Sequence, residues 1–86
     1  LLEAPAFRLL GGPWYSFTKK GEPMYLFTYT SSILNGPYIM FIDYKPYIKG
    51  EYKNDKKDGE WLYYDFDEKI RKTIIYKDGK AIKTIR

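Results

Sequence analysis

Gly12-Pro13-Trp14 returns in altered form as Gly36-Pro37-Tyr38 and as Gly59-Glu60-Trp61, at intervals of 24 and 23 residues. Each copy holds a second aromatic residue three positions after the first, and a tyrosine further on. In chain order these residues are Phe17, Phe41 and Tyr64, followed by Tyr29, Tyr52 and Tyr76. A repeat of this length is typical of a supersecondary unit that buries its apolar face only by stacking on its neighbours. The spacing therefore predicts repeats at 12–35, 36–58 and 59–86, preceded by an N-terminal cap or edge strand at 1–11.

Strand and turn signals alternate along the whole chain. The segment 61–64 and the segment 70–76 are rich in aromatic and β-branched residues, and Asp78-Gly79 is a two-residue hairpin signal. No window of a dozen residues has apolar spacing of 3.6 without proline or glycine, so no long helix is expected. We predict an all-β fold, an antiparallel meander of at least six short strands arranged as stacked hairpins.

More detailed expectations concern the turns and the faces of one strand. Strict alternation predicts that Ile70, Lys72, Ile74 and Tyr76 share one face of a strand. Turn chemistry predicts further turns at four places, namely 19–21, Asn35-Gly36, Lys45-Pro46 and 54–59.

The stretch Tyr52-Lys53-Asn54-Asp55-Lys56-Lys57-Asp58-Gly59-Glu60-Trp61, with Tyr64 and then Tyr76-Lys77-Asp78-Gly79-Lys80, resembles the MORN repeat. It is most similar to the variant found in bacterial proteins labelled as YwqK-like antitoxins. In this chain Ser31-Ser32 stands where the family usually has Asn-Gly, and Asp55 stands at a glycine position. The resemblance implies an elongated antiparallel sheet of stacked hairpins that serves as a scaffold, with proteins and anionic lipids as partners.

The repeated residues are interpreted as structural. Glycine allows a positive φ or a close backbone approach, and aromatic residues on neighbouring strands form cross-strand pairs. In particular, Trp61 is predicted to pack over the preceding hairpin near Tyr38. The alternative is a flat stacking surface for nucleobases or sugars. The structural set comprises Gly12, Trp14, Phe17, Tyr29, Gly36, Tyr38, Phe41, Tyr52, Gly59, Trp61, Tyr64, Tyr76 and Gly79.

The composition argues against an enzyme and against a bound cofactor. Among 86 residues there is neither cysteine nor histidine, so disulfides, a histidine base and conventional zinc or transition-metal sites are excluded. The serines at positions 16, 31 and 32 lack a nucleophile motif. Asp65, Asp67 and Glu68 are expected to be solvated residues of a polar turn. Stability must then come from burial of aromatic rings, which make up 20% of the chain.

The net charge of +4 lies entirely in the second half of the chain. Residues 45–86 hold twelve basic and eight acidic side chains in alternation, a pattern typical of an ordinary solvated surface. No apolar run reaches the length of a membrane span, so no transmembrane segment is expected. The chain does not begin with methionine, and we expect a processed product or a fragment.

The leading functional hypothesis is a non-enzymatic protein-interaction scaffold, antitoxin-like or anchoring, whose edge strands allow β-augmentation or oligomerisation. The first alternative is binding to an anionic surface, nucleic acid or phospholipid, through the basic second half, and its affinity would then fall steeply with salt. The second alternative is carbohydrate or cell-envelope binding by exposed tyrosine and tryptophan. The residues proposed to contact a partner are Tyr44, Tyr47, Tyr63, Lys53, Lys56, Lys57, Arg71 and Lys72.

Overall fold

The computed structural model describes residues 12–86, and the predicted N-terminal cap or edge strand at 1–11 lies outside the described residues. Strands account for most of the described chain, which contains no helix. They are β1 (Gly12–Phe17), β2 (Pro23–Thr30), β3 (Ile33–Leu34), β4 (Gly36–Ile42), β5 (Lys45–Lys53), β6 (Lys56–Tyr64), β7 (Ile70–Lys77) and β8 (Lys80–Ile85).

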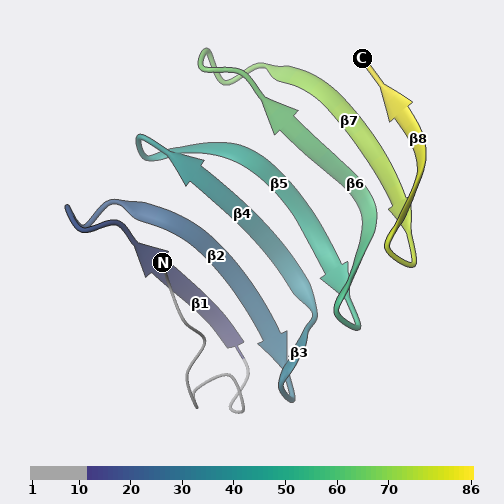
Figure 1. Ribbon diagram of the computed structural model, residues 1–86, viewed down its shortest axis with the longest axis horizontal. Helices are drawn as coiled ribbons and strands as arrows, with labels where there is room; N and C mark the ends of the chain where they lie inside the picture. The colour runs from purple at the N-terminus through teal and green to yellow at the C-terminus, as the bar shows by residue number, and fades with distance from the viewer. Residues whose placement is uncertain (1–11) are drawn as a thin grey trace.

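The strands form one open antiparallel sheet in the order β1-β2-β4-β5-β6-β7-β8, with the short β3 paired to β2. The ribbons lie side by side in a single curved layer (Figure 1), and the described residues add no second layer. The prediction of an all-β antiparallel meander is therefore confirmed. Loops within repeats lie along one margin of the sheet, and turns between repeats lie along the other (Figure 1). We call these the intra-repeat margin and the inter-repeat margin.

The sheet register reproduces the sequence repeat. In each hairpin the repeat glycine lies directly opposite the repeat tyrosine, in the pairs Gly12–Tyr29, Gly36–Tyr52 and Gly59–Tyr76. All three glycines have positive φ, with values of 92°, 126° and 73°. A side chain at such a φ is strained, which explains why glycine recurs there. The predicted equivalence of the three glycines is confirmed.

A β-bulge also recurs in each hairpin, near the intra-repeat margin. The register shifts at the second aromatic residue of each copy, between Ser16 and Phe17, Met40 and Phe41, and Tyr63 and Tyr64. The returning strand thereby gains one unpaired residue, which is Met24, Tyr47 or Arg71. Because the bulge places Ile70 opposite Tyr64, Ile70 faces away from Lys72, and its predicted alternation with Lys72, Ile74 and Tyr76 is wrong at this one position.

Two-residue turns connect successive repeats. Both central residues have positive φ in Ser31-Ser32, Asn54-Asp55 and Asp78-Gly79, as a type I′ turn requires. The expected hairpin at Asp78-Gly79 is confirmed.

Three expected turns are displaced or shortened. The turn expected at Asn35-Gly36 lies instead at Ser31-Ser32, and the turn expected over 54–59 spans only Asn54-Asp55. The turn expected at Lys45-Pro46 is formed by Asp43-Tyr44, whose φ values are 51° and 65°, and Lys45 already begins β5. The type I′ geometry explains these shifts, because its twist matches that of the flanking strands even where glycine is absent.

Hydrogen bonds tie each of two inter-repeat turns to the preceding repeat. The Asp55 N–H donates to the Leu34 carbonyl at 2.8 Å, and the Gly79 N–H donates to the Lys57 carbonyl at 3.0 Å. Asp55 adds a side-chain contact, because its Oδ1 accepts the Leu34 N–H at 2.8 Å. Successive repeats are thus joined by turn contacts as well as by strand pairing.

The core consists of rings that cover one another on one face of the sheet. Trp61 is only 1% exposed, and its ring stacks on Tyr38 with centroids 5.1 Å apart. Tyr52 and Tyr76 meet the indole edge to face at 5.3 and 5.9 Å. The indole lies over Gly50, and its Nε1–H donates to the Glu51 carbonyl at 3.1 Å. The predicted packing of Trp61 near Tyr38 is confirmed.

The two faces of the sheet differ in composition. The aromatic face carries the rings of the core, including Tyr25, Phe27, Tyr38, Tyr52, Trp61 and Tyr76. The opposite face carries a mixed row that stays in register across seven strands, formed by Tyr15, Leu26, Ile39, Lys49, Leu62, Thr73 and Ile85. A single-layer sheet leaves this second face without a covering layer among the described residues.

Candidate partner-binding surfaces

The eight residues proposed to contact a partner do not form one site. Tyr44 is exposed at the tip of the β4–β5 turn. Lys53 and Lys56 flank the inter-repeat turn between β5 and β6. The other five form two groups. Tyr47 and Arg71 are the unpaired residues at the β4–β5 and β6–β7 bulges, whereas Lys57, Tyr63 and Lys72 lie on the aromatic face.

Tyr47 and Arg71 are brought together because they are the equivalent bulge residues of two successive repeats. The Arg71 guanidinium lies 5.8 Å from the centroid of the Tyr47 ring, within the range of a cation–π contact. The Phe66 ring also packs against Tyr47, with centroids 5.8 Å apart. Phe66 and Ile70 are 68% and 57% exposed. We call Tyr47, Phe66, Ile70 and Arg71 the Arg71 patch.

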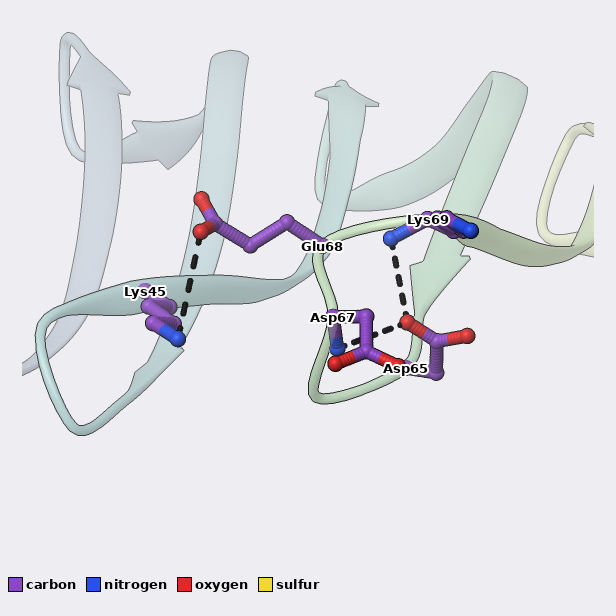
Figure 2. A network of polar contacts seen from close by, with 5 residues as sticks. All are labelled: Lys45, Asp65, Asp67, Glu68 and Lys69. Carbon is purple, nitrogen blue, oxygen red and sulfur yellow. Dashed lines mark hydrogen bonds and ion pairs between the residues drawn. The ribbon is translucent and has the colours of Figure 1, made fainter.

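The loop that displays Phe66 is held by its own hydrogen bonds. Asp65 Oδ1 accepts the N–H of Asp67 at 2.9 Å and the N–H of Lys69 at 3.0 Å, as Figure 2 shows. The Asp65 N–H donates to the Lys69 carbonyl, and Glu68 reaches Lys45 on the neighbouring hairpin at 3.9 Å. Asp65 is therefore a structural residue of the loop rather than only a solvated one, whereas Asp67 and Glu68 are exposed as expected.

On the aromatic face the cationic side chains lie over rings. The Lys57 ammonium is 4.7 Å from the Trp61 centroid and 4.9 Å from the Tyr76 centroid. Lys72 lies 5.0 Å from the ring of Tyr63. These lysines help to cover the core, and their methylene groups shield apolar surface that a single-layer sheet would otherwise leave to water.

Three tyrosine hydroxyls on the aromatic face titrate abnormally. Burial raises the pKa of the Tyr38 hydroxyl above its usual range, and burial also raises the pKa of Tyr52. Burial, followed by a hydrogen bond with Tyr76, raises the pKa of Tyr63 to about 12. All three hydroxyls are therefore neutral near pH 7, and none of them has the lowered pKa that would suit a general base.

Lysines meet across the strands at the inter-repeat margin. Lys53 lies directly opposite Lys56, and Lys77 lies directly opposite Lys80. Like charges at directly opposed positions destabilise a sheet. The Lys56 side chain approaches Gly79 of the next turn, so the two lysine pairs belong to adjacent turns.

Three open depressions on residues 12–86 hold about 220 to 310 Å³, and one of them is lined by Pro46, Lys49, Tyr64 and Glu68. Within the same residues, no group of acidic side chains has the geometry of a metal site. The described residues also include no helix of the length and hydropathy needed to cross a bilayer.

Sequence reasoning identified Tyr47 and Arg71 but missed Phe66 and Ile70. Phe66 lies in a loop where no periodic pattern marks it, and Ile70 reaches the patch only because of the bulge. Comparison of the chain with family models, curated proteins and solved structures finds no match.

Proposed function

We propose that this chain is a non-enzymatic protein-interaction scaffold and that the Arg71 patch contacts its partner. The observation that carries the proposal is the contact of an arginine with two aromatic rings from two successive repeats, next to an exposed isoleucine that adjoins the arginine in sequence. Tyrosine and arginine are enriched among the residues that dominate binding energy at protein interfaces.

The patch is suited to binding because its side chains are held before a partner arrives. Tyr47 and Arg71 extend from strands at bulges, and bulges commonly redirect side chains at functional positions. Phe66 is held by the bonded loop at 65–69. A rigid aromatic anchor loses little conformational entropy on binding, which favours affinity.

Family membership is a second part of the proposal. The opposition of glycine and tyrosine in three hairpins, together with type I′ turns between repeats, supports a MORN-like scaffold. A YwqK-like antitoxin role, in which the scaffold neutralises or anchors another protein, is the form of this function that the sequence resemblance favours.

Binding to an anionic surface is the second candidate. It is favoured by the opposed lysine pairs Lys53–Lys56 and Lys77–Lys80, since a phosphate-rich ligand would relieve their repulsion. Titration with anionic vesicles and with oligothymidine over a range of salt concentrations separates this candidate from the first, because affinity from counterion release falls linearly with salt on a log–log plot.

The test of the leading proposal is affinity capture with three immobilised proteins. They are the unmodified chain, the double variant Phe66→Ser with Arg71→Ser, and the control Phe17→Ser, which removes an exposed ring from β1. A protein captured by the unmodified chain and by the control, but not by the double variant, supports the patch. Equal capture by all three, with matching thermal stability, shows that the patch is not the contact surface.

A further inference from the structure

β8, one of the two edge strands of the described sheet, is the most exposed of the described strands. All six of its residues are exposed, and Ile82 and Ile85 retain 62% and 46% of their accessible surface. Its one neighbour in the described sheet is β7, so the backbone groups on its outer side pair with no described strand. An unpaired edge of this kind is a template for an added strand.

The repeat shows what such a strand would be. β4, β6 and β8 each follow an inter-repeat turn, and β4 and β6 pair on their next side with the antiparallel strands β5 and β7. β8 therefore occupies the position that β4 and β6 have in the other two repeats, where each pairs on its far side with an antiparallel strand. Figure 1 shows β8, in yellow, along the side of the sheet away from β1.

Charge on this part of the sheet selects the chemistry of the added strand. Residues 69–86 include seven basic side chains and one acidic side chain, Asp78, whereas the rest of the chain is slightly acidic in balance. Two of the seven, Lys80 and Lys83, lie on β8 itself and are exposed. An approaching acidic segment is attracted to this surface, and a basic one is repelled.

A departure from the repeat strengthens this selection. Counted from the preceding turn, Lys83 occupies the position of Gly36 and Gly59, the glycines that oppose tyrosines. Lys83 and Ile85 lie on the same face of the sheet, opposite Ile75 and Thr73. The matching strand would present an acidic residue beside Lys83 and an apolar residue beside Ile85, two positions away on that face.

We propose that the outer edge of β8 binds an extended acidic segment of a partner protein as an added antiparallel strand. The proposal rests on the function proposed above and specifies the partner chemistry. A second copy of the chain is a poorer occupant, because pairing β8 with itself brings Lys80 and Lys83 of both copies together.

The probe is a short fluorescein-labelled peptide that repeats Glu-Glu-Val-Val, so that each face of the strand presents glutamate and valine two positions apart. Its binding to the whole chain is measured by fluorescence anisotropy. Two reference peptides accompany it. One has proline at alternate valine positions, which keeps the charge but cannot complete a strand ladder, and one has lysine in place of glutamate. The expected result is binding of the glutamate–valine peptide alone, with slowed amide exchange in β8 on binding.

Charge reversal locates the site. Lys80→Glu with Lys83→Glu should weaken binding by about tenfold or more, because it opposes the charge of the peptide at both positions. Lys19→Glu with Lys20→Glu makes the same change in net charge in the exposed loop between β1 and β2, across the sheet, and should leave affinity within about twofold.

Three outcomes overturn the proposal. They are equal binding of the proline peptide, equal loss of affinity in the Lys19/Lys20 variant, and a dimer that protects β8 amides without any peptide. None of these outcomes changes the result of the capture test on Phe66 and Arg71. Failure of the β8 proposal can therefore be distinguished from failure of the scaffold proposal. Conversely, peptide binding at β8 that survives the loss of the Arg71 patch shows that the edge acts independently.

Discussion

The aromatic face and the Arg71 patch use similar residues for different ends. On the aromatic face, rings from successive repeats pack on one another around Trp61, and lysines extend over them. In the Arg71 patch, Tyr47 and Phe66 also meet, but Phe66 and the nearby Ile70 are mostly exposed. The difference teaches that, in a sheet one layer thick, ring density decides burial more than ring chemistry does, since each ring is shielded only by its neighbours.

Replacing Trp61 with alanine should have the largest effect of any substitution considered. We expect the free energy of unfolding to fall by about 3–5 kcal/mol, because a buried ring is lost and its neighbours cannot close the space. A loss of this size approaches the whole stability of a small domain. Urea denaturation followed by circular dichroism measures this loss. An unfolding free energy close to that of the unmodified chain would contradict the role of Trp61 as the centre of the core.

A methyl group added beneath the indole should also destabilise the aromatic face. A Cβ at position 50 would clash with the Trp61 ring at Cδ2, so Gly50→Ala forces the ring to move. The expected cost is about 1–3 kcal/mol, as for other overpacked cores. The same change made together with Trp61→Ala should add almost nothing, because the clashing ring is gone. Additive losses in this double-mutant cycle would contradict the contact.

High pH should weaken the aromatic face selectively. Because the pKa of Tyr63 is raised to about 12, and those of Tyr38 and Tyr52 are also raised, the neutral hydroxyls are favoured in the folded chain. Their contribution to stability is complete below the ordinary tyrosine pKa of about 10 and is lost as pH rises towards 12. Urea midpoints measured from pH 8 to pH 12 should fall only above about pH 10, and Tyr63→Phe should flatten that fall. A midpoint that stays constant to pH 12 would disprove this titration.

The smallest stability effect is expected in the Arg71 patch. Phe66→Ser should change the free energy of unfolding by no more than about 0.5 kcal/mol, because the ring is mostly exposed. Thermal denaturation beside Trp61→Ala makes the comparison. A loss comparable to that of Trp61 would assign Phe66 to the core and would withdraw it from the proposed partner surface.

Much of the fold could be predicted because glycine and large aromatic residues recur in phase. Gly12, Gly36 and Gly59 adopt a backbone conformation that other residues avoid, so the spacing of these glycines predicts the register of the hairpins. The turn at Asp43-Tyr44 could not be found in this way. Its positive φ values occur at residues other than glycine and are imposed by the twist of the paired strands.

The surface was harder to predict than the fold. Tyr47 and Arg71 are 24 positions apart, and their contact depends on two bulges that the local sequence does not predict. The bulge between β6 and β7 also turns Ile70 to the face opposite Lys72, whereas strict alternation predicts that the two residues share a face. Lys57 and Lys72 read as displayed charges in the sequence, but the structure places them over rings, because the rings beneath them lack a covering layer.

The bonds from Asp55 to Leu34 and from Gly79 to Lys57 also bear on how the chain reaches its native state. Every strand on the main path pairs with a strand close to it in sequence, so each step of assembly closes only a short loop, and closure of short loops has a small entropic cost. Each new turn then attaches to a repeat that is already formed. Folding can therefore nucleate in one hairpin and propagate to its neighbours in the manner of a zipper, with the middle repeats opening last and the outer strands first.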